Sequence, residues 1–224
     1  MMAKRPPTRS AAEFIPSTPT LPHLRRAAKI CTGCDLYQRA TQTVFGEGAS
    51  HAKLIFVGEQ PGDQEDLQGH PFVGPAGQLL DKALVEAGIP RNEVYITNAV
   101  KHFKWEPQGK RRKHKRPSAG EVAACRPWLA SELNAIHPHI LVCLGATAAQ
   151  SVLGKVVRIK EARGQFMNTP WAPATYVTIH PSSIFRHRER IQQEAEYRQF
   201  VEDLKQIRRK LAETVRSPEP SDVR

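Results

Sequence analysis

Short apolar runs alternate with longer amphipathic stretches along most of this chain. Four such runs predict buried strands at 53–57, 94–97, 140–144 and 175–179. Apolar residues that recur at steps of three and four predict helices at 76–87, 119–136, 146–153 and 192–212. Strands that alternate with helices are typical of a parallel sheet covered by helices, so we expect an α/β fold with one four-stranded, mostly parallel sheet.

The two ends of the chain differ in composition from the middle. Residues 1–20 contain four prolines and few large apolar residues, which indicates a flexible arm, and residues 214–224 predict a loose tail. We therefore expect one domain over 21–213 in this chain of 224 residues. The apolar runs are too short for a transmembrane helix, and the basic start lacks the apolar run of a secretory signal. We expect a cytoplasmic monomer that does not act on membranes.

Charge is unevenly distributed along the chain. The net charge is +11 and the pI is about 9.8, which favours a polyanionic partner such as nucleic acid. Residues 101–116 hold eight basic residues and one acidic residue, whereas residues 51–98 hold seven acidic and three basic residues. The run KRRKHKR within the basic segment can also be a solvated loop or a localisation-like tract.

Polar side chains follow the ends of the predicted strands, which in a parallel sheet form one edge where ligands bind. Glu59 and Gln60 follow the first strand, Asn98 the second, the loop 145–147 the third, and His180 with Ser182 and Ser183 the fourth. We expect the Glu, Gln, Asn and His side chains to converge on one pocket, with Asp63 and Asp66 close by. Taken singly, Asn98 can cap a turn and His180 can be a hydrogen-bonded core histidine.

Phe72 lies in the glycine-containing segment 71–77, which leads into a predicted helix. A flat apolar ring beside polar groups can stack on a heterocycle while Asn98 hydrogen-bonds its edge, which is how extruded bases are recognised. The alternative is that Phe72 packs in the core.

The four cysteines favour free thiols or a metal site over a disulfide framework. The spacing Cys31-x-x-Cys34 is a modest metal signal on its own. Cys143 lies in the middle of a predicted strand, where a buried thiol is expected. Cys125 is then the third candidate ligand, and His102 is the candidate for the fourth.

Six segments together resemble the iron–sulfur uracil-DNA glycosylases of the family-4 kind. They are AAKICTGCDLYQRATQTVFGEG, GEQPGDQEDLQGHPFVGPAG, TNAVKHFKW, AACRPWL, LVCLGATAA and HPSSIFR, in this order over about residues 20–213. The resemblance implies a three-layer α/β/α sandwich. It also implies a [4Fe–4S] cluster held by Cys31, Cys34, His102 and Cys125, although these ligand types alone would also suit zinc.

Two departures from the family-4 pattern resemble the X-type uracil-DNA glycosylases (UdgX). Family-4 enzymes usually carry a cysteine where this chain has His102, and they lack the basic insertion that ends in His114. The resemblance to the X-type group implies a covalent bond between uracil-containing DNA and the histidine of a KRRIH-like loop. Lys113 stands here in place of the isoleucine of that loop, a change that bears on how the loop packs.

The resemblance implies cleavage of the C1′–N1 bond of deoxyuridine and a role for each candidate residue. His180 would donate to a uracil oxygen, Glu59 or Asp63 would supply negative charge or position the loop, and His114 would attack C1′. Asn98, a backbone amide around Gln60, and Phe72 would bind the base. The phosphates would be held by Ser182, Ser183, Lys110, Arg111 and Arg112. The expected partner is uracil-containing DNA, including single strands.

His114 would have to be neutral to attack, and five cationic neighbours within 110–115 are expected to disfavour its protonated form. Two alternatives remain open from the sequence. One is an ordinary turnover glycosylase in which His114 only contacts phosphate. The other is a non-catalytic, metal-stabilised nucleic-acid-binding protein.

Overall fold

The computed structural model describes residues 9–216, and the predictions for residues 1–8 and 217–224 lie outside the described residues. Within the predicted arm, η1 (Ala11–Phe14) is a 3-10 helix whose N-cap is Ser10. The side chain of Ala11 is buried in one hydrophobic cluster with Leu24 and Trp128. No helix in the described part of the chain is long and apolar enough to cross a membrane.

The central sheet has six strands in the order β1-β3-β2-β6-β8-β7. Its four inner strands are parallel and are those predicted from the sequence: β3 (Val94–Asn98), β2 (Leu54–Gly58), β6 (Ile140–Leu144) and β8 (Ala172–Thr178). The predicted count of four is wrong, because β1 (Glu47–Gly48) and β7 (Phe166–Thr169) add antiparallel edges. The first of these has two residues and the second is irregular, so neither gives a clear sequence pattern.

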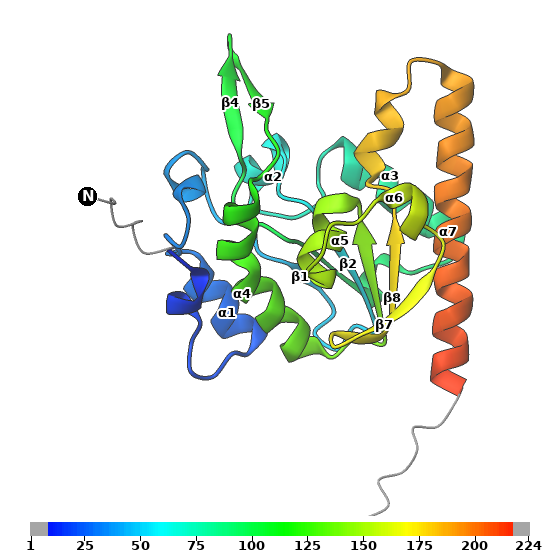
Figure 1. Cartoon of the computed structure of the whole chain (residues 1–224), viewed down its shortest axis with the longest axis horizontal. Helices are drawn as coiled ribbons and strands as arrows, with labels where there is room; N and C mark the ends of the chain where they lie inside the picture. The colour runs from blue at the N-terminus through cyan, green and yellow to red at the C-terminus, as the bar shows by residue number, and fades with distance from the viewer. Residues whose placement is uncertain (1–8, 217–224) are drawn as a thin grey trace, which may run out of the picture.

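Helices cover both faces of the sheet, which confirms the three-layer α/β/α fold (Figure 1). Leu54 and Phe56 of β2 face the core under α3 (Pro75–Ala87) and α7 (Arg190–Arg216), whereas Ile55 and Val57 face the core under α4 (Ala119–Ile136) and α5 (Ala146–Leu153). The remaining helices are short: α1 (Leu21–Ala28), η2 (Asp35–Gln38), α2 (Asp63–Gln68), η3 (Arg91–Glu93), α6 (Ile159–Ala162) and η4 (Pro181–Arg186).

The ends of α4 and α5 are those expected from the sequence, for identifiable local reasons. Ser118 accepts a hydrogen bond from the backbone N–H of Glu121, and the Glu121 carboxylate accepts one from the backbone N–H of Ser118. This capping box fixes the start of α4. Helix α5 ends at Gly154, whose φ of 69° is a left-handed conformation that glycine adopts readily.

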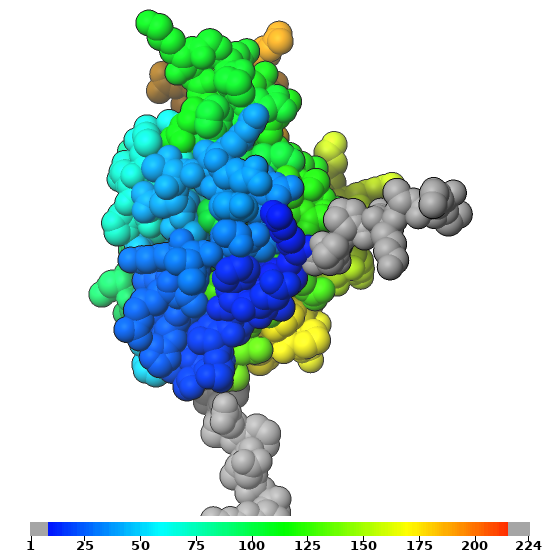
Figure 2. Space-filling model, turned by 90° about the vertical axis from the view of Figure 1, so that its left-hand side faces the viewer, coloured from blue at the N-terminus to red at the C-terminus, as the bar shows by residue number. Residues whose placement is uncertain are grey.

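The basic segment forms a β-hairpin rather than an irregular loop. Strands β4 (Trp105–Gln108) and β5 (Arg111–His114) are antiparallel and are joined through Gly109, whose φ is 60°. The hairpin projects beyond the end of the sheet at which the parallel strands finish (Figure 1). In the space-filling view this green segment protrudes at the top of the molecule (Figure 2). Alternation along β5 puts Arg112 and His114 on the opposite face from Lys113, which is exposed. Lysine at this position therefore buries no charge.

A buried ion pair links α4 to the sheet. The Lys101 ammonium lies 2.5 Å from the Glu132 carboxylate, and both side chains are at most 1% exposed. The same carboxylate accepts hydrogen bonds from the hydroxyls of Tyr95 and Thr97 and from the backbone N–H of Gly46. With all of these partners present, the charges are compensated in an interior where an unpaired charge would be costly.

We expect Glu132→Leu to lower the free energy of unfolding by about 3–5 kcal/mol, because it leaves the Lys101 ammonium buried without a counter-charge. The double variant Lys101→Met with Glu132→Leu should lose less, since no charge is left unpaired. Urea denaturation of the three proteins checks this. A double variant as unstable as Glu132→Leu alone would show that packing, not charge, is what Glu132 supplies.

Candidate active site

A cavity of about 770 Å³ opens at the carboxyl ends of the parallel strands. It brings together nine of the residues singled out from the sequence: Glu59, Gln60, Asp63, Phe72, Asn98, His114, His180, Ser182 and Ser183. They come from the ends of β2, β3 and β8, from the start of α2, from the turn before α3 and from the hairpin. Lys110, Arg111 and Arg112 do not line this cavity.

Asn98 and Phe72 form one wall of the cavity. The side chain of Asn98 is buried, and its Oδ1 has no hydrogen-bond partner within residues 9–216. A Cβ at Gly58 would lie 2.3 Å from this oxygen and 2.7 Å from the Phe72 ring, so only glycine leaves room for both side chains here. A buried acceptor without a partner is costly unless a ligand supplies the donor.

Phe72 adopts a backbone conformation that is unfavourable for a bulky residue, with φ at 58°. Gly77 makes room for it, because a Cβ there would lie 1.7 Å from the Phe72 carbonyl oxygen. The ring lies 5.9 Å from the His180 ring, centroid to centroid. The strained conformation therefore directs a flat apolar surface toward the polar part of the cavity.

His180 presents a nitrogen–hydrogen donor to the cavity. Its Nδ1 accepts a hydrogen bond from the backbone N–H of Ser182 at 3.2 Å, which leaves the proton of the neutral ring on Nε2. The Ser182 hydroxyl also lies 2.8 Å from Nδ1, and the Ser183 hydroxyl donates to the His180 carbonyl. Burial, with smaller contributions from His114 and Arg186, lowers the pKa of His180 to about 4. Both serines therefore orient His180 in this structure.

Gln60 fixes the state of His114. The Gln60 amide oxygen accepts from the backbone N–H of Lys104, and its NH₂ group donates to the Lys115 carbonyl at 2.9 Å, so the amide cannot be turned over. The same NH₂ lies 2.9 Å from His114 Nε2. Because the amide nitrogen is a donor only, Nε2 must carry a lone pair, and the ring proton is on Nδ1.

The pKa of His114 is lowered, as the sequence predicts, but for a different reason. The largest cause is burial, and Arg186 adds to it, whereas the Glu59 carboxylate, 3.8 Å from Nε2, opposes it. The cations of the hairpin are not the source of the shift. The neutral form of His114 is favoured because its ring packs against the domain and loses part of its contact with water. The ring centroid lies 5.9 Å from that of Phe103.

Glu59 is held by a residue whose role the sequence did not reveal. Thr147, at the start of α5, donates a hydrogen bond of 2.5 Å to the Glu59 carboxylate. Its hydroxyl in turn accepts from Arg116, whose guanidinium lies 3.7 Å from the same carboxylate. The only sequence signal for Thr147 is its place directly after the third parallel strand. Glu59 thus carries negative charge at the cavity wall in a fixed orientation.

Arg112, which the sequence predicts to be a phosphate ligand, is paired with two carboxylates of the domain in this structure. Its guanidinium binds the carboxylates of Asp63 and Asp66 at 2.6 Å each and also contacts Thr41. Its side chain is 20% exposed. These contacts attach the hairpin to α2. They also compensate the negative charge of Asp63, which is the alternative to Glu59 as the carboxylate that stabilises positive charge on the sugar. Lys110 and Arg111 are exposed on the hairpin.

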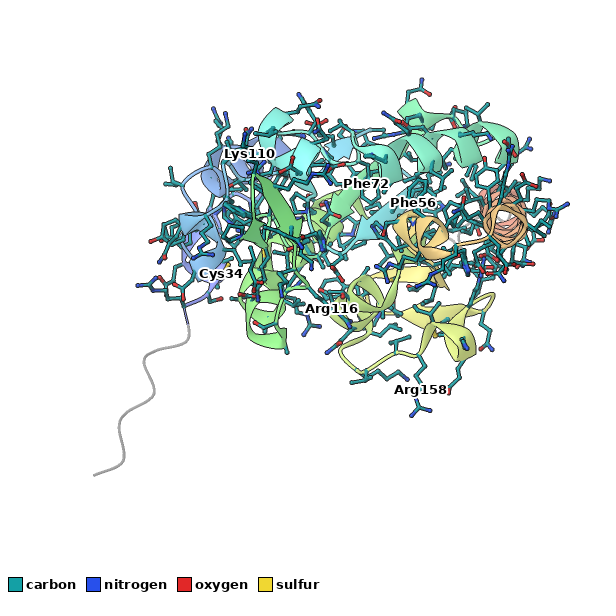
Figure 3. The ribbon with its side chains drawn as sticks, turned by 90° about the horizontal axis from the view of Figure 1, so that it is seen from above. Cys34, Phe56, Phe72, Lys110, Arg116 and Arg158 are labelled. Atoms are coloured by element: carbon teal, nitrogen blue, oxygen red, sulfur yellow. The ribbon has the colours of Figure 1, made fainter. Side chains whose placement is uncertain are left out.

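Three of the proposed metal ligands are neighbours on the other side of the hairpin. Cys31 and Cys125 are buried in one cluster that also contains Trp128, with Cys34 packed against it. Burial is the main cause that raises the pKa of Cys125 to about 12; the Lys101 charge opposes it, and the charges of Cys34 and Cys31 add to it. Such mutual effects require proximity. Figure 3 shows Cys34 on the N-terminal side of the molecule, away from Phe72.

The chemistry around these thiols fits a metal cluster. The Trp128 indole N–H donates to the Cys31 sulfur, and the Lys101 backbone N–H donates to the Cys125 sulfur, as expected around metal-bound thiolates. His102 donates from Nε2 to the Thr43 hydroxyl, which itself donates to the Ala28 carbonyl, so the lone pair of His102 is on Nδ1. Within residues 9–216, no three such side chains are already gathered around one point.

Comparison with known proteins points to one superfamily. The profile described as the Uracil DNA glycosylase superfamily matches residues 45–205. The type-4 uracil-DNA glycosylase of Thermotoga maritima is 41% identical over 161 residues, which cover 71% of this chain and 80% of that protein. The type-4 uracil-DNA glycosylase of Archaeoglobus fulgidus is 35% identical over 191 residues, 82% of this chain and 92% of that protein.

The depressed pKa of His180 predicts a pH-dependent stability. In the unfolded chain His180 takes up a proton near its ordinary pKa of 6.5, whereas the folded protein resists protonation down to about 4. The free energy of unfolding should therefore fall as the pH drops from 6.5 toward 4. His180→Gln cannot titrate, so its slope in this range should be shallower by up to about 1.4 kcal/mol per pH unit.

Chemical denaturation of both proteins at several pH values measures this difference. Above pH 7 the two curves should run parallel, which is the internal control. Equal slopes between pH 6.5 and 4 would contradict a neutral, buried His180.

Proposed function

The chain belongs to the uracil DNA glycosylase superfamily, and we propose that it removes uracil from DNA and then captures the exposed sugar on His114. The removal of uracil is proposed because the similar proteins are type-4 uracil-DNA glycosylases. The observation that carries the capture is the neutral imidazole of His114 on the cavity wall, with its lone pair on Nε2. The basic hairpin and His102 support an X-type enzyme over an ordinary type-4 enzyme.

Uracil is recognised in this proposal by the wall that Asn98 and Phe72 form. The unpartnered Oδ1 of Asn98 accepts from N3–H of the base, and its NH₂ donates to O4. Cytosine presents the reversed pattern, with an acceptor at N3 and an amino group at C4, so this amide orientation rejects it. The Phe72 ring stacks on the base, and a backbone amide around Gln60 reads its remaining edge.

Cleavage of the C1′–N1 bond leaves its electron pair on N1 of uracil and positive charge on the sugar. The negative charge spreads to O2 of the departing base, where the Nε2–H of neutral His180 donates. The Glu59 carboxylate, oriented by Thr147, stabilises the oxocarbenium-like sugar. Glu59 suits this role better than Asp63, whose charge is already compensated by Arg112.

Capture uses the lone pair of His114 Nε2, which leaves the Gln60 amide and forms a bond to C1′. The ring then carries a positive charge, which is removed when the Nδ1 proton passes to solvent. A nucleophile tethered beside the sugar outcompetes water because its effective concentration is high. The N-alkyl imidazole that results has no good leaving path at neutral pH, so each protein molecule reacts once.

The proposal includes a [4Fe–4S] cluster held by Cys31, Cys34, Cys125 and His102. When bound, the cluster would act as a crosslink between the N-terminal segment and the base of the hairpin. Two observations support the cluster. Three of the thiols lie close together, and two of their sulfur atoms accept hydrogen bonds from N–H groups. These residues lie apart from the cavity, so we assign no step of the reaction to them.

The cluster predicts a yellow-brown protein after aerobic purification. Cys125→Ala should bleach this colour and lower the melting temperature, because it removes a ligand. Cys143→Ala, the matched control in the middle of β6, should keep the colour. Absorption spectra and iron analysis check both variants. A colourless protein that contains one zinc ion per chain would contradict the iron–sulfur assignment.

Covalent capture predicts that an oligonucleotide with one uracil gives a protein–DNA band that survives boiling in detergent, in an amount equal to the protein. His114→Ser should abolish the band while uracil is still released, since water then reaches C1′. Asn98→Ala should reduce both release and adduct by roughly 10²- to 10³-fold, the loss typical of one transition-state contact.

Three results of that experiment would contradict the proposal. An adduct that persists in His114→Ser would mean that another residue is the nucleophile. Many turnovers by the unmodified protein without an adduct would indicate the ordinary glycosylase. If no uracil is released and DNA is merely bound, the non-catalytic alternative would be correct.

A further inference from the structure

A second hollow lies next to the candidate active site, between the starts of α4 and α5. Its volume is about 420 Å³, and we call it the α4–α5 groove. It shares Arg116 and Thr147 with the larger cavity, so the two hollows lie side by side with these two residues between them. Figure 3 shows Arg116 at this position, between the hairpin and the helices that follow it.

The α4–α5 groove is positively charged. Its lining includes Arg116 and Arg126 and contains no acidic residue. Arg126 is exposed and makes no ion pair with residues 9–216. Ala119, the first residue of α4, also lines the groove. A cationic groove without a carboxylate is suited to an anion.

Ser151 provides an independent sign of a ligand in the same groove. The residue lines the groove and is 4% exposed, yet its hydroxyl has no hydrogen-bond partner in the described part of the chain. Buried hydroxyls are normally paired, and an unpaired one is costly. A phosphate oxygen bound by Arg126 would supply the missing acceptor after a rotation of the serine side chain.

We propose that the α4–α5 groove binds a phosphodiester of the DNA strand directly next to the extruded uridine, on one side of it only. The inference rests on the proposed function, because the larger cavity must hold the uridine. Because Arg116 and Thr147 line both hollows, a strand that leaves the cavity past these two residues would reach the groove. The phosphate contacts expected of Arg112 are thereby assigned elsewhere, to Arg126 and Ser151.

The test uses oligonucleotides that carry one 2′-fluoro-2′-deoxyuridine, whose fluorine slows cleavage so that equilibrium binding can be measured. One series is lengthened a nucleotide at a time on the 5′ side, the other on the 3′ side. The unmodified protein should gain affinity along both series. Arg126→Glu should lose about tenfold, and about one unit of salt slope, along one series only.

Two further variants make the test specific. Arg209→Glu makes the same change of charge on the exposed part of α7, outside both hollows, and should match the unmodified protein. Ser151→Ala should leave the free energy of unfolding unchanged, because it removes a hydroxyl without a partner. It should nevertheless weaken binding of the same series as Arg126→Glu by about fivefold.

The outcomes separate this inference from the proposed function. If the unmodified protein prefers uridine-containing oligonucleotides but Arg126→Glu behaves like Arg209→Glu, the groove assignment is wrong. An equal loss of affinity along both series would mean that Arg126 acts only through the overall electrostatic field of the protein. That result would also contradict a direct contact between Arg126 and the phosphate. If the unmodified protein shows no preference for uridine, the proposed function itself fails, and the inference fails with it.

Discussion

The Gln60 amide is the contact on which the proposed chemistry depends. It stands at the end of β2, accepts from the backbone of Lys104, donates to the backbone of Lys115 and donates to Nε2 of His114. Because its backbone partners prevent the amide from turning over, it selects the one neutral tautomer in which Nε2 can attack. The same side chain therefore contacts the backbone at both ends of the hairpin and selects the tautomer of its histidine.

Positive charge serves several separate purposes in this protein, although the net charge of +11 suggests a single DNA-binding patch. Arg112 links the hairpin to α2 through ion pairs. Arg186 lowers the pKa of both His114 and His180 and so favours their neutral forms. Lys101 compensates a carboxylate inside the core. Only cations without such partners, among them Arg126, are free to bind phosphate. Counting basic residues therefore overestimates the DNA contacts.

The sequence predicted the parallel strands, the longer helices and the edge at which the site lies, because burial periodicity and helix caps are local signals. It missed β1 and β7, which are too short or irregular to show a pattern, and it treated the basic segment as a loop. The roles of Thr147 and Arg112 depend on partners more than 30 residues away, as the separations of 88 residues from Glu59 and 49 from Asp63 illustrate. The cause of the low His114 pKa could not be predicted either, since it depends on the partial burial of a half-exposed ring against distant parts of the chain.

The most direct test of this account is the tautomer of His114 in the free protein at neutral pH. Heteronuclear NMR correlation of the imidazole nitrogens, assigned by comparison with His114→Ser, distinguishes the two neutral forms from the imidazolium. The account predicts a neutral ring with its proton on Nδ1 and an unprotonated Nε2, and a change in that pattern when Gln60 is replaced by alanine. A proton on Nε2, or a charged ring, would contradict a histidine held ready as a nucleophile.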